Sequence, residues 1–225
     1  MEAEVAVIIP AYNEEKRIVR TLTTLKEINP LYKIYVVDDG STDATAEKVA
    51  KVKDLCLIKS MKNKGKGQAL KTGIKAALAS SDIIVFLDAD LQESAGEVEK
   101  LIKPIVDNEA DVTVAKFPPA KKKGGFGLVK KLARYGVYIN TGKKLDTVLS
   151  GQRAFKKKVL ENLTFNYEGY GVELGMTIDL LNKGYLIKEV EVNMFHNETG
   201  RDLQGFLHRG KQFFQILKVF LKKTK

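Results

Sequence analysis

Two aspartates, Asp88 and Asp90, follow directly after an apolar run in the segment FLDADLQ, residues 86–92. The apolar run predicts a buried β-strand, so both carboxylates are expected at its carboxyl end. Carboxylate oxygens placed there could hold a divalent metal ion and, through it, a diphosphate. Acidic pairs at strand ends more often cap a helix or face water, so this motif does not decide the chemistry by itself.

The segment DDGSTD, residues 38–43, has the composition of a tight turn between a strand and a helix. Gly40 tolerates unusual backbone angles, and Thr42 or Asp43 could cap the next helix. Asp39 follows the strand directly, so its carboxylate could instead hydrogen-bond a base or a ribose. Both interpretations remain open for this segment.

Two further polar segments also allow both a structural interpretation and a ligand-binding interpretation. Asn13 could cap a helix that begins at Glu14, or both residues could contact a nucleotide. In KNKGKGQALKTG, residues 62–73, glycines flank Lys66 ahead of a helix, so backbone amides and the ammonium group could meet a phosphate. The spacing is not that of a Walker loop, and a lysine-rich loop is more often simply solvated.

Apolar runs of strand length alternate with segments of helical period, which predicts βαβ units and an α/β fold with a mostly parallel sheet flanked by helices. The expected strands are residues 5–9, 34–37, 55–58, 83–87, 111–115 and 185–192, and the expected helices are 14–28, 42–52, 67–79, 97–108, 171–184 and one from about 205. Ligands bind beyond the carboxyl ends of such strands, where the polar motifs of the first half fall.

The chain is basic and has one cysteine. Its 225 residues include 38 Lys and Arg against 28 Asp and Glu, and the formal net charge of +10 favours anionic partners. Cys56 lies in an apolar run, so we expect it to be buried, and it cannot form a disulfide within the chain. We expect a cytoplasmic protein, because no stretch resembles a signal peptide or a membrane span.

Four ordered motifs together resemble the GT-A-fold nucleotide-sugar glycosyltransferases of family 2. They are PAYNEE at residues 10–15, VDDGSTD at 37–43, NKGKGQAL at 63–70 and DADLQ at 88–92. The resemblance implies that Asp90 ligates Mg²⁺ or Mn²⁺ with Asp88 close by, and that Lys66 approaches the nucleoside or its diphosphate. The nucleotide-sugar site that it implies comprises Pro10, Ala11, Asn13, Glu14, Asp39, Lys66, Asp88, Ala89, Asp90, Ser150 and Gly151.

Three motifs of the second half look similar to the retaining glucosyl-3-phosphoglycerate synthase and mannosylglycerate-type enzymes, which share the GT-A fold. They are SGQRAF at residues 150–155, EGYGVELGMTID at 168–179 and MFHNETGRD at 194–202. This resemblance implies that His196 completes the metal site of Asp90, and that Glu173 and the backbone at Ser150 and Gly151 face the sugar and the acceptor.

His196 and Glu173 also have ordinary structural interpretations. A histidine near a strand end is usually a surface or hydrogen-bonded residue, whereas His196 with Asp90 and phosphate oxygens would suit Mg²⁺ or Mn²⁺ better than zinc. Glu173 lies on an apolar helical segment, so its carboxylate is either paired or in contact with substrate, and we favour substrate. Asp90 and Glu173 are thus the expected catalytic residues.

The stereochemical outcome depends on what Glu173 does. An inverting enzyme needs a base facing the acceptor, which Glu173 could supply. A retaining enzyme can use the leaving phosphate oxygen to take the acceptor proton, with Glu173 orienting the acceptor. The resemblance in the second half favours retention.

Basic residues of the second half are candidates for binding an anionic acceptor. Arg201 is the preferred ligand, because a guanidinium group binds phosphate through two hydrogen bonds. The lysines of 121–123, beside two glycines, could form a closing lid or a solvated charge run. The other candidates are Lys143, Lys144, Arg153 and Arg209.

The final segment, residues 205–225, carries an apolar stripe among basic residues. Such a helix could lie on an anionic membrane, giving peripheral contact at its inner face, or pack on its own domain or on a second copy in a homodimer. We expect one GT-A domain over 1–225, with a nucleotide-sugar half at 1–115, an acceptor half at 116–204 and this amphipathic helix.

The leading hypothesis from the sequence is transfer of a hexose, from UDP-glucose, to a small anionic acceptor such as a phosphoglycerate-like compound. The alternative is transfer to a polyprenyl phosphate at the membrane surface. We do not expect nucleic-acid binding, because the basic residues are spread along the chain and the strand-end carboxylates would repel phosphates without a metal. A nucleotide-sugar sensor without turnover is a further alternative.

Overall fold

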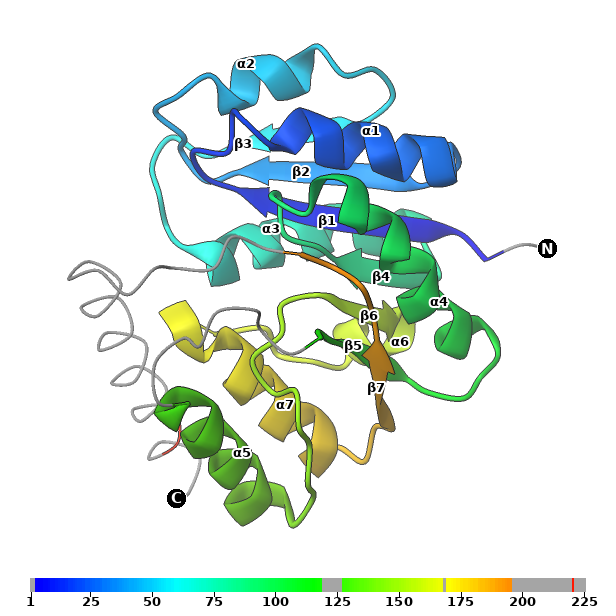
Figure 1. The fold of residues 1–225 in the computed structure, drawn as a ribbon, viewed down its shortest axis with the longest axis vertical. Helices are drawn as coiled ribbons and strands as arrows, with labels where there is room; N and C mark the ends of the chain where they lie inside the picture. The colour runs from blue at the N-terminus through cyan, green and yellow to red at the C-terminus, as the bar shows by residue number, and fades with distance from the viewer. Residues whose placement is uncertain (1–2, 119–126, 168, 196–219, 221–225) are drawn as a thin grey trace.

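The computed structural model describes residues 3–118, 127–167, 169–195 and 220 of the chain (Figure 1). Within these residues one sheet has the strand order β3-β2-β1-β4-β6-β5-β7. Strand β6 is antiparallel to both neighbours, and the other pairings are parallel. The predicted α/β sheet is therefore confirmed. The strands are β1 (Val5–Ala11), β2 (Lys33–Asp38), β3 (Cys56–Lys59), β4 (Ile83–Phe86), β5 (Val112–Lys116), β6 (Arg153–Lys156) and β7 (Ile187–Glu191).

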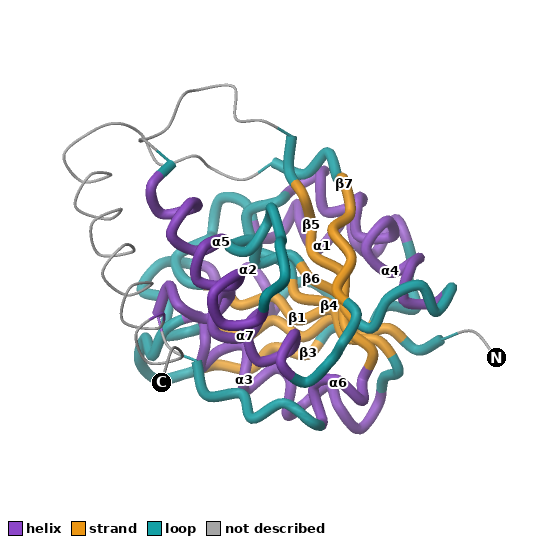
Figure 2. Tube along the Cα trace, turned by 90° about the horizontal axis from the view of Figure 1, so that it is seen from below, coloured by secondary structure: helices purple, strands orange, loops and turns teal. Residues whose placement is uncertain are grey.

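Helices cover both faces of the sheet (Figures 1 and 2). Helices α1 and α4 cover one face, α3, α6 and α7 cover the other, and α5 packs on α7. The α-helices are α1 (Ile18–Ile28), α2 (Thr45–Ala50), α3 (Lys66–Ala77), α4 (Val98–Val106), α5 (Leu128–Thr141), α6 (Lys157–Glu161) and α7 (Val172–Asn182). Short 3₁₀ helices are η1 (Leu78–Ser80), η2 (Gln92–Glu97) and η3 (Gly169–Gly171).

Strand β1 shows why both faces of the sheet must be covered. Val5, Val7 and Ile9 point into the core under α1 and α4, whereas Ala6 and Ile8 point into the core under α3 and α7. Successive side chains of a strand face opposite sides, so an uninterrupted apolar run needs helices on both. Burying each of these valine or isoleucine side chains stabilises the folded state by about 1.5–3 kcal/mol relative to leaving it exposed.

The sequence pattern does not predict β6, α6 or α5. Strand β6 has the sequence RAFK, so it lacks an apolar run, and it forms because β4 and β5 both pair with it. The expectation for Cys56 is wrong, since this residue is exposed. Cys56 begins β3, which lies at the edge of the sheet, where no further strand covers it within the described residues.

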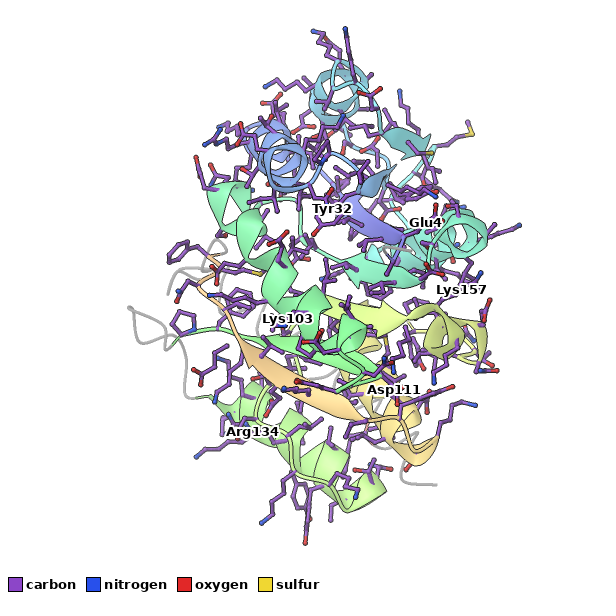
Figure 3. The ribbon with its side chains drawn as sticks, turned by 90° about the vertical axis from the view of Figure 1, so that its right-hand side faces the viewer. Glu4, Tyr32, Lys103, Asp111, Arg134 and Lys157 are labelled. Carbon is purple, nitrogen blue, oxygen red and sulfur yellow. The ribbon has the colours of Figure 1, made fainter. Side chains whose placement is uncertain are left out.

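Polar contacts stabilise the edge of the sheet at which β1 begins, opposite the predicted site. The carboxylate of Asp111 lies 3.4 Å from the Nζ atom of Lys156 and accepts the backbone N–H of Leu186 at 3.2 Å. The backbone N–H of Glu4 donates to the carboxylate of Asp82 at 3.0 Å. Figure 3 views this side of the molecule, with Glu4 and Asp111 labelled.

Gly73 allows α3 to approach β1, because a Cβ atom at this position would lie 2.4 Å from the Cγ2 atom of Ile8. We expect Gly73→Ala to lower the free energy of unfolding by about 1–3 kcal/mol through overpacking, measured by urea denaturation. Gly96→Ala is the matched control, since its nearest contact would be an ordinary 3.4 Å. An equal free energy of unfolding in the two variants would contradict the prediction.

Candidate active site

The turn after β1 is tied to the turn after β2 by Asn13. Its backbone N–H donates to the Oγ atom of Ser41 at 3.0 Å, and its Oδ1 atom accepts the N–H of Thr42 at 2.9 Å. Asn13 has a φ of 57°, a left-handed conformation that asparagine tolerates better than most residues. Helix α1 begins at Ile18 rather than at Glu14, so the interpretation of Asn13 as the cap of that helix is wrong.

Asp39 connects the end of β2 to the loop that precedes α3. This residue is 4% exposed, and its carboxylate accepts the backbone N–H of Lys64 at 3.0 Å and that of Gly65 at 2.7 Å. The neighbouring Gly40 has a φ of 76°, and a Cβ there would lie 2.6 Å from the carbonyl carbon of Lys62. Asp39 thus shapes the lysine loop, and its contact with a base or ribose stays a prediction.

Thr21, on α1, holds the turn that carries the two aspartates. Its buried hydroxyl donates to the carbonyl oxygen of Ala89 and accepts the N–H of Gln92, each at 2.8 Å. Ala89 is 4% exposed and its side chain belongs to the core. The sequence analysis missed Thr21, because a threonine inside a helix carries no signal of a contact 68 residues away.

Lys66 lies between two carboxylates that come from different parts of the chain. It is the first residue of α3, and its Nζ atom lies 2.7 Å from Oδ1 of Asp88 and 3.4 Å from Oε1 of Glu173. Burial alone would lower the pKa of the ammonium group, but the carboxylates of Asp88 and Glu173 raise that pKa above its ordinary value. Lys66 is therefore a permanent cation between the carboxylates of Asp88 and Glu173.

The segment before β6 lies against this cation. A Cβ atom on Gly151 would be 2.3 Å from the Nζ atom of Lys66, so a larger residue there would displace the ammonium group from this position. The side-chain amide of Gln152 donates to Oδ2 of Asp88, and the hydroxyl of Ser150 donates to the amide oxygen of Gln152 at 3.2 Å. The structure thus brings Ser150 and Gly151 close to Asp88 and adds Gln152, which the sequence analysis missed, while contact of Ser150 and Gly151 with the sugar stays a prediction.

Arg153 holds the segment before β6 through hydrogen bonds to its backbone. Its buried guanidinium group donates to the carbonyl oxygens of Ser150 at 2.9 Å and Val148 at 2.7 Å, and to the hydroxyl of Thr177 at 2.9 Å. Burial lowers the pKa of Arg153 to about 10. The expectation that Arg153 binds an acceptor anion is wrong, because its donors are used inside the protein.

Acidic groups gather at the carboxyl ends of β1 and β4. Burial raises the pKa of Glu14, and the charges of Asp90 and Asp88 raise it further. The guanidinium group of Arg17, whose Nη2 atom lies 2.7 Å from Oε2 of Glu14, opposes this rise. Within the described residues, no group of three or more His, Cys, Asp or Glu side chains is arranged to hold a metal ion. Carboxylates of this kind suit Mg²⁺ or Mn²⁺, which are commonly held by one or two carboxylates together with substrate phosphates.

Several predicted residues lie outside the part of the chain that the structure describes. They are His196, Arg201, the lysines of 121–123, and residues 205–219 and 221–225. Phe220 is described, and the centroid of its ring lies 6.1 Å from the centroid of the Tyr135 ring on α5. Among the described residues, no helix has the length and apolar character needed to span a bilayer.

The sequence profile of glycosyl transferase family 2 matches residues 6–164, which contain Lys66, Asp88 and the Gly151 segment. The chain belongs to glycosyl transferase family 2. It is therefore a glycosyltransferase, and the GT-A resemblance of its four motifs is confirmed.

Two relatives are similar over almost the whole chain of this glycosyltransferase. An uncharacterised protein of Methanocaldococcus jannaschii is 34% identical, over 97% of this chain and 90% of that protein. The dolichol-phosphate mannosyltransferase of Pyrococcus furiosus is 30% identical over 96% of this chain, which spans 62% of that enzyme's length.

A solved structure has the same fold. Glucosyl-3-phosphoglycerate synthase of Mycobacterium tuberculosis, in complex with Mn²⁺, UDP-glucose and phosphoglyceric acid, superposes with a TM-score of 0.80. The two chains are 25% identical, and the match covers 99% of this glycosyltransferase and 80% of the synthase.

The raised pKa of Glu14 predicts a pH-dependent gain in stability for Glu14→Gln. A carboxyl whose pKa is raised by folding stabilises the protein fully below its unfolded-state pKa, and this contribution is lost as pH rises through the folded-state pKa. We therefore expect Glu14→Gln to melt at a higher temperature than wild type at about pH 7, and the gain to shrink towards about pH 4. Glu27→Gln, at an exposed position of α1, is the control, and a gain for Glu14→Gln that is independent of pH would contradict the prediction.

Proposed function

We propose that this glycosyltransferase moves a hexose from a nucleoside-diphosphate sugar to an acceptor that carries a phosphate group, with a divalent metal ion. The observation that carries the proposal is the position of Lys66, whose ammonium group lies at the start of α3 between the carboxylates of Asp88 and Glu173. A helix N-terminus and an ammonium group together suit the diphosphate of a sugar donor.

Each part of the site has a task in this reaction. Breaking the bond between the sugar and the diphosphate leaves negative charge on the phosphate, which Lys66 and the amides at the start of α3 would stabilise. When bound, Mg²⁺ or Mn²⁺ would neutralise more of this charge, with Asp90 and His196 as its protein ligands. The nucleoside would lie over the joined turns after β1 and β2, in contact with Pro10, Ala11, Asn13, Glu14 and Asp39.

Glu173 would act on the acceptor side. Its side chain is 13% exposed and lies in the first turn of α7, 3.4 Å from Lys66. The carboxylate that pairs with Lys66 would either orient an acceptor hydroxyl or take its proton. When Lys66 turns to a bound diphosphate, Glu173 becomes available to the acceptor.

Asp90→Asn tests the donor side of the proposal. We expect the variant to release UDP or GDP from the matching nucleotide hexose at least about 100-fold more slowly than wild type in the presence of Mn²⁺. The readout is nucleotide release over a range of Mn²⁺ concentrations. Asp107→Asn is the control, because Asp107 pairs with Lys103 on the surface at 2.7 Å. Equal rates for wild type and Asp90→Asn would sink the assignment of Asp90.

A polyprenyl phosphate is the acceptor that we favour. The Pyrococcus furiosus relative, named for dolichol phosphate, is more similar in sequence than the synthase whose structure superposes, at 30% against 25% identity. This ordering reverses the preference of the sequence analysis, which rested on the motifs of the second half. A lipid acceptor requires the enzyme to work at a membrane surface.

The exposed side of helix α5 has a composition that suits contact with a membrane surface. Its outer side exposes large apolar residues at helical spacing, while its inner side packs on α7, whose first turn carries Glu173. The exposed residues are Leu128, Tyr135, Tyr138 and Ile139. Residues 128–144 contain five basic residues and no acidic one, a composition that suits the interface of an anionic bilayer.

A small phosphate-bearing acceptor is the second candidate. The superposed synthase holds phosphoglyceric acid together with Mn²⁺ and UDP-glucose, and the match covers 99% of this chain. Both candidates carry a phosphate group, so the same basic residues could serve either. Assays with phosphoglyceric acid and with a short-chain polyprenyl phosphate in detergent separate them, because only one should accept sugar.

The α5 surface makes a prediction for vesicle binding. Vesicles of phosphatidylglycerol and phosphatidylcholine should sediment wild type, whereas the triple variant Leu128→Ser, Tyr138→Ser, Ile139→Ser should stay mostly in solution. The matched control replaces the exposed Leu31, Val106 and Leu186 by serine, on other surfaces. Equal sedimentation of the two triple variants would argue against α5 as the docking surface.

A further inference from the structure

Gln152 is a buried polar residue between the two halves of the site. It is 2% exposed, and its backbone carbonyl oxygen accepts the N–H of Ala115 at 2.9 Å, which anchors it to the end of β5. Its side-chain amide donates to Oδ2 of Asp88. A glutamine is rarely buried this deeply without a partner for both ends of its amide, and here both ends are used.

The hydrogen bonds also determine which way the amide points. The hydroxyl of Ser150 donates to Oε1 of Gln152 at 3.2 Å, so the NH₂ group is left to face Asp88. Gln152 therefore offers a donor to the carboxylate, and it does so without adding charge. A neutral donor matters here, because Lys66 already supplies the positive charge at 2.7 Å on the other oxygen of Asp88.

These contacts restrict the rotation of the Asp88 carboxylate. Among the described residues, Lys66 binds Oδ1 and Gln152 binds Oδ2, so each oxygen of the carboxylate has a ligand that restricts the plane of the group. The position of the Lys66 ammonium group, within reach of both Asp88 and Glu173, depends on that orientation. An error of about 1 Å in a charged group can cost about 100-fold in rate.

We propose that Gln152 is a positioning residue for glycosyl transfer, which holds Asp88 so that Lys66 lies between the donor side and the acceptor side. The inference rests on the proposed function of this edge of the sheet. It assigns Gln152 an effect on turnover rather than on donor affinity, because the residue contacts Asp88 and is buried beneath the site.

Two variants of Gln152 separate positioning from packing. Gln152→Leu removes the donor and keeps a similar volume, whereas Gln152→Glu keeps the shape and places a carboxyl group against Asp88. We expect kcat to fall about 10-fold or more in both, with the KM for the nucleotide sugar changed by less than about 3-fold. The measurement is initial rates of nucleotide release and of acceptor glycosylation.

The pH profile distinguishes the two variants. The carboxyl group that Gln152→Glu introduces can donate to Asp88 when it is protonated, as the native amide does, whereas its ionised form repels Asp88. Gln152→Glu should therefore regain activity relative to wild type as pH falls from about 8 to about 5, whereas Gln152→Leu should show a constant deficit.

Thr113→Val is the control for losing a buried hydrogen bond away from the site, since the Thr113 hydroxyl donates to the carbonyl oxygen of Leu101 at 2.8 Å. Its kcat should stay at the wild-type value when the folded fraction is matched by circular dichroism. Wild-type kcat in Gln152→Leu, or equal losses in Gln152→Leu and Thr113→Val, would overturn the inference. Absence of sugar transfer by wild type would instead overturn the proposed function, and the role of Gln152 with it.

Discussion

The site depends on the ion pairs that the ammonium group of Lys66 forms with the carboxylates of Asp88 and Glu173. Asp88 follows β4 and Glu173 lies in the first turn of α7, so the fold brings together two carboxylates that would repel one another without a cation between them. Two glycines make this possible. Gly151 leaves space for the ammonium group, and Gly67 allows the first turn of α3 to approach the backbone of Tyr167, where a Cβ would lie 2.1 Å from the carbonyl oxygen.

Buried polar side chains hold the turns around this cation. Asp39 binds the backbone of the lysine loop, Thr21 binds the turn of the two aspartates, and Arg153 binds the carbonyl groups before β6. Removing one partner of such a buried contact leaves the other unsatisfied, which costs about 1–3 kcal/mol or more. The turns are therefore held in place before any ligand arrives, as electrostatic stabilisation of a leaving group requires.

The antiparallel strand β6 explains how the second half reaches the site. In its register with β4, Phe86 is opposite Arg153, so the residues that precede β6 lie beside those that follow β4. A parallel strand in this place would have put its following residues there instead. This reversal places Gly151 and Gln152 against Asp88, and it brings elements of the second half of the chain to the carboxyl end of β4.

The sequence by itself determined the parallel strands of the first half and the residues at their carboxyl ends, because apolar runs and the turn residues after them are local signals. It also predicted Lys66, Asp88 and Glu173 as site residues, through the family motifs. Only the tertiary structure decided that Lys66 bridges the two carboxylates, that Arg153 is buried, and that Gln152 and Thr21 support the aspartates. Those roles arise from contacts between residues 22 to 107 positions apart, where neither partner's type nor its neighbours indicate the other.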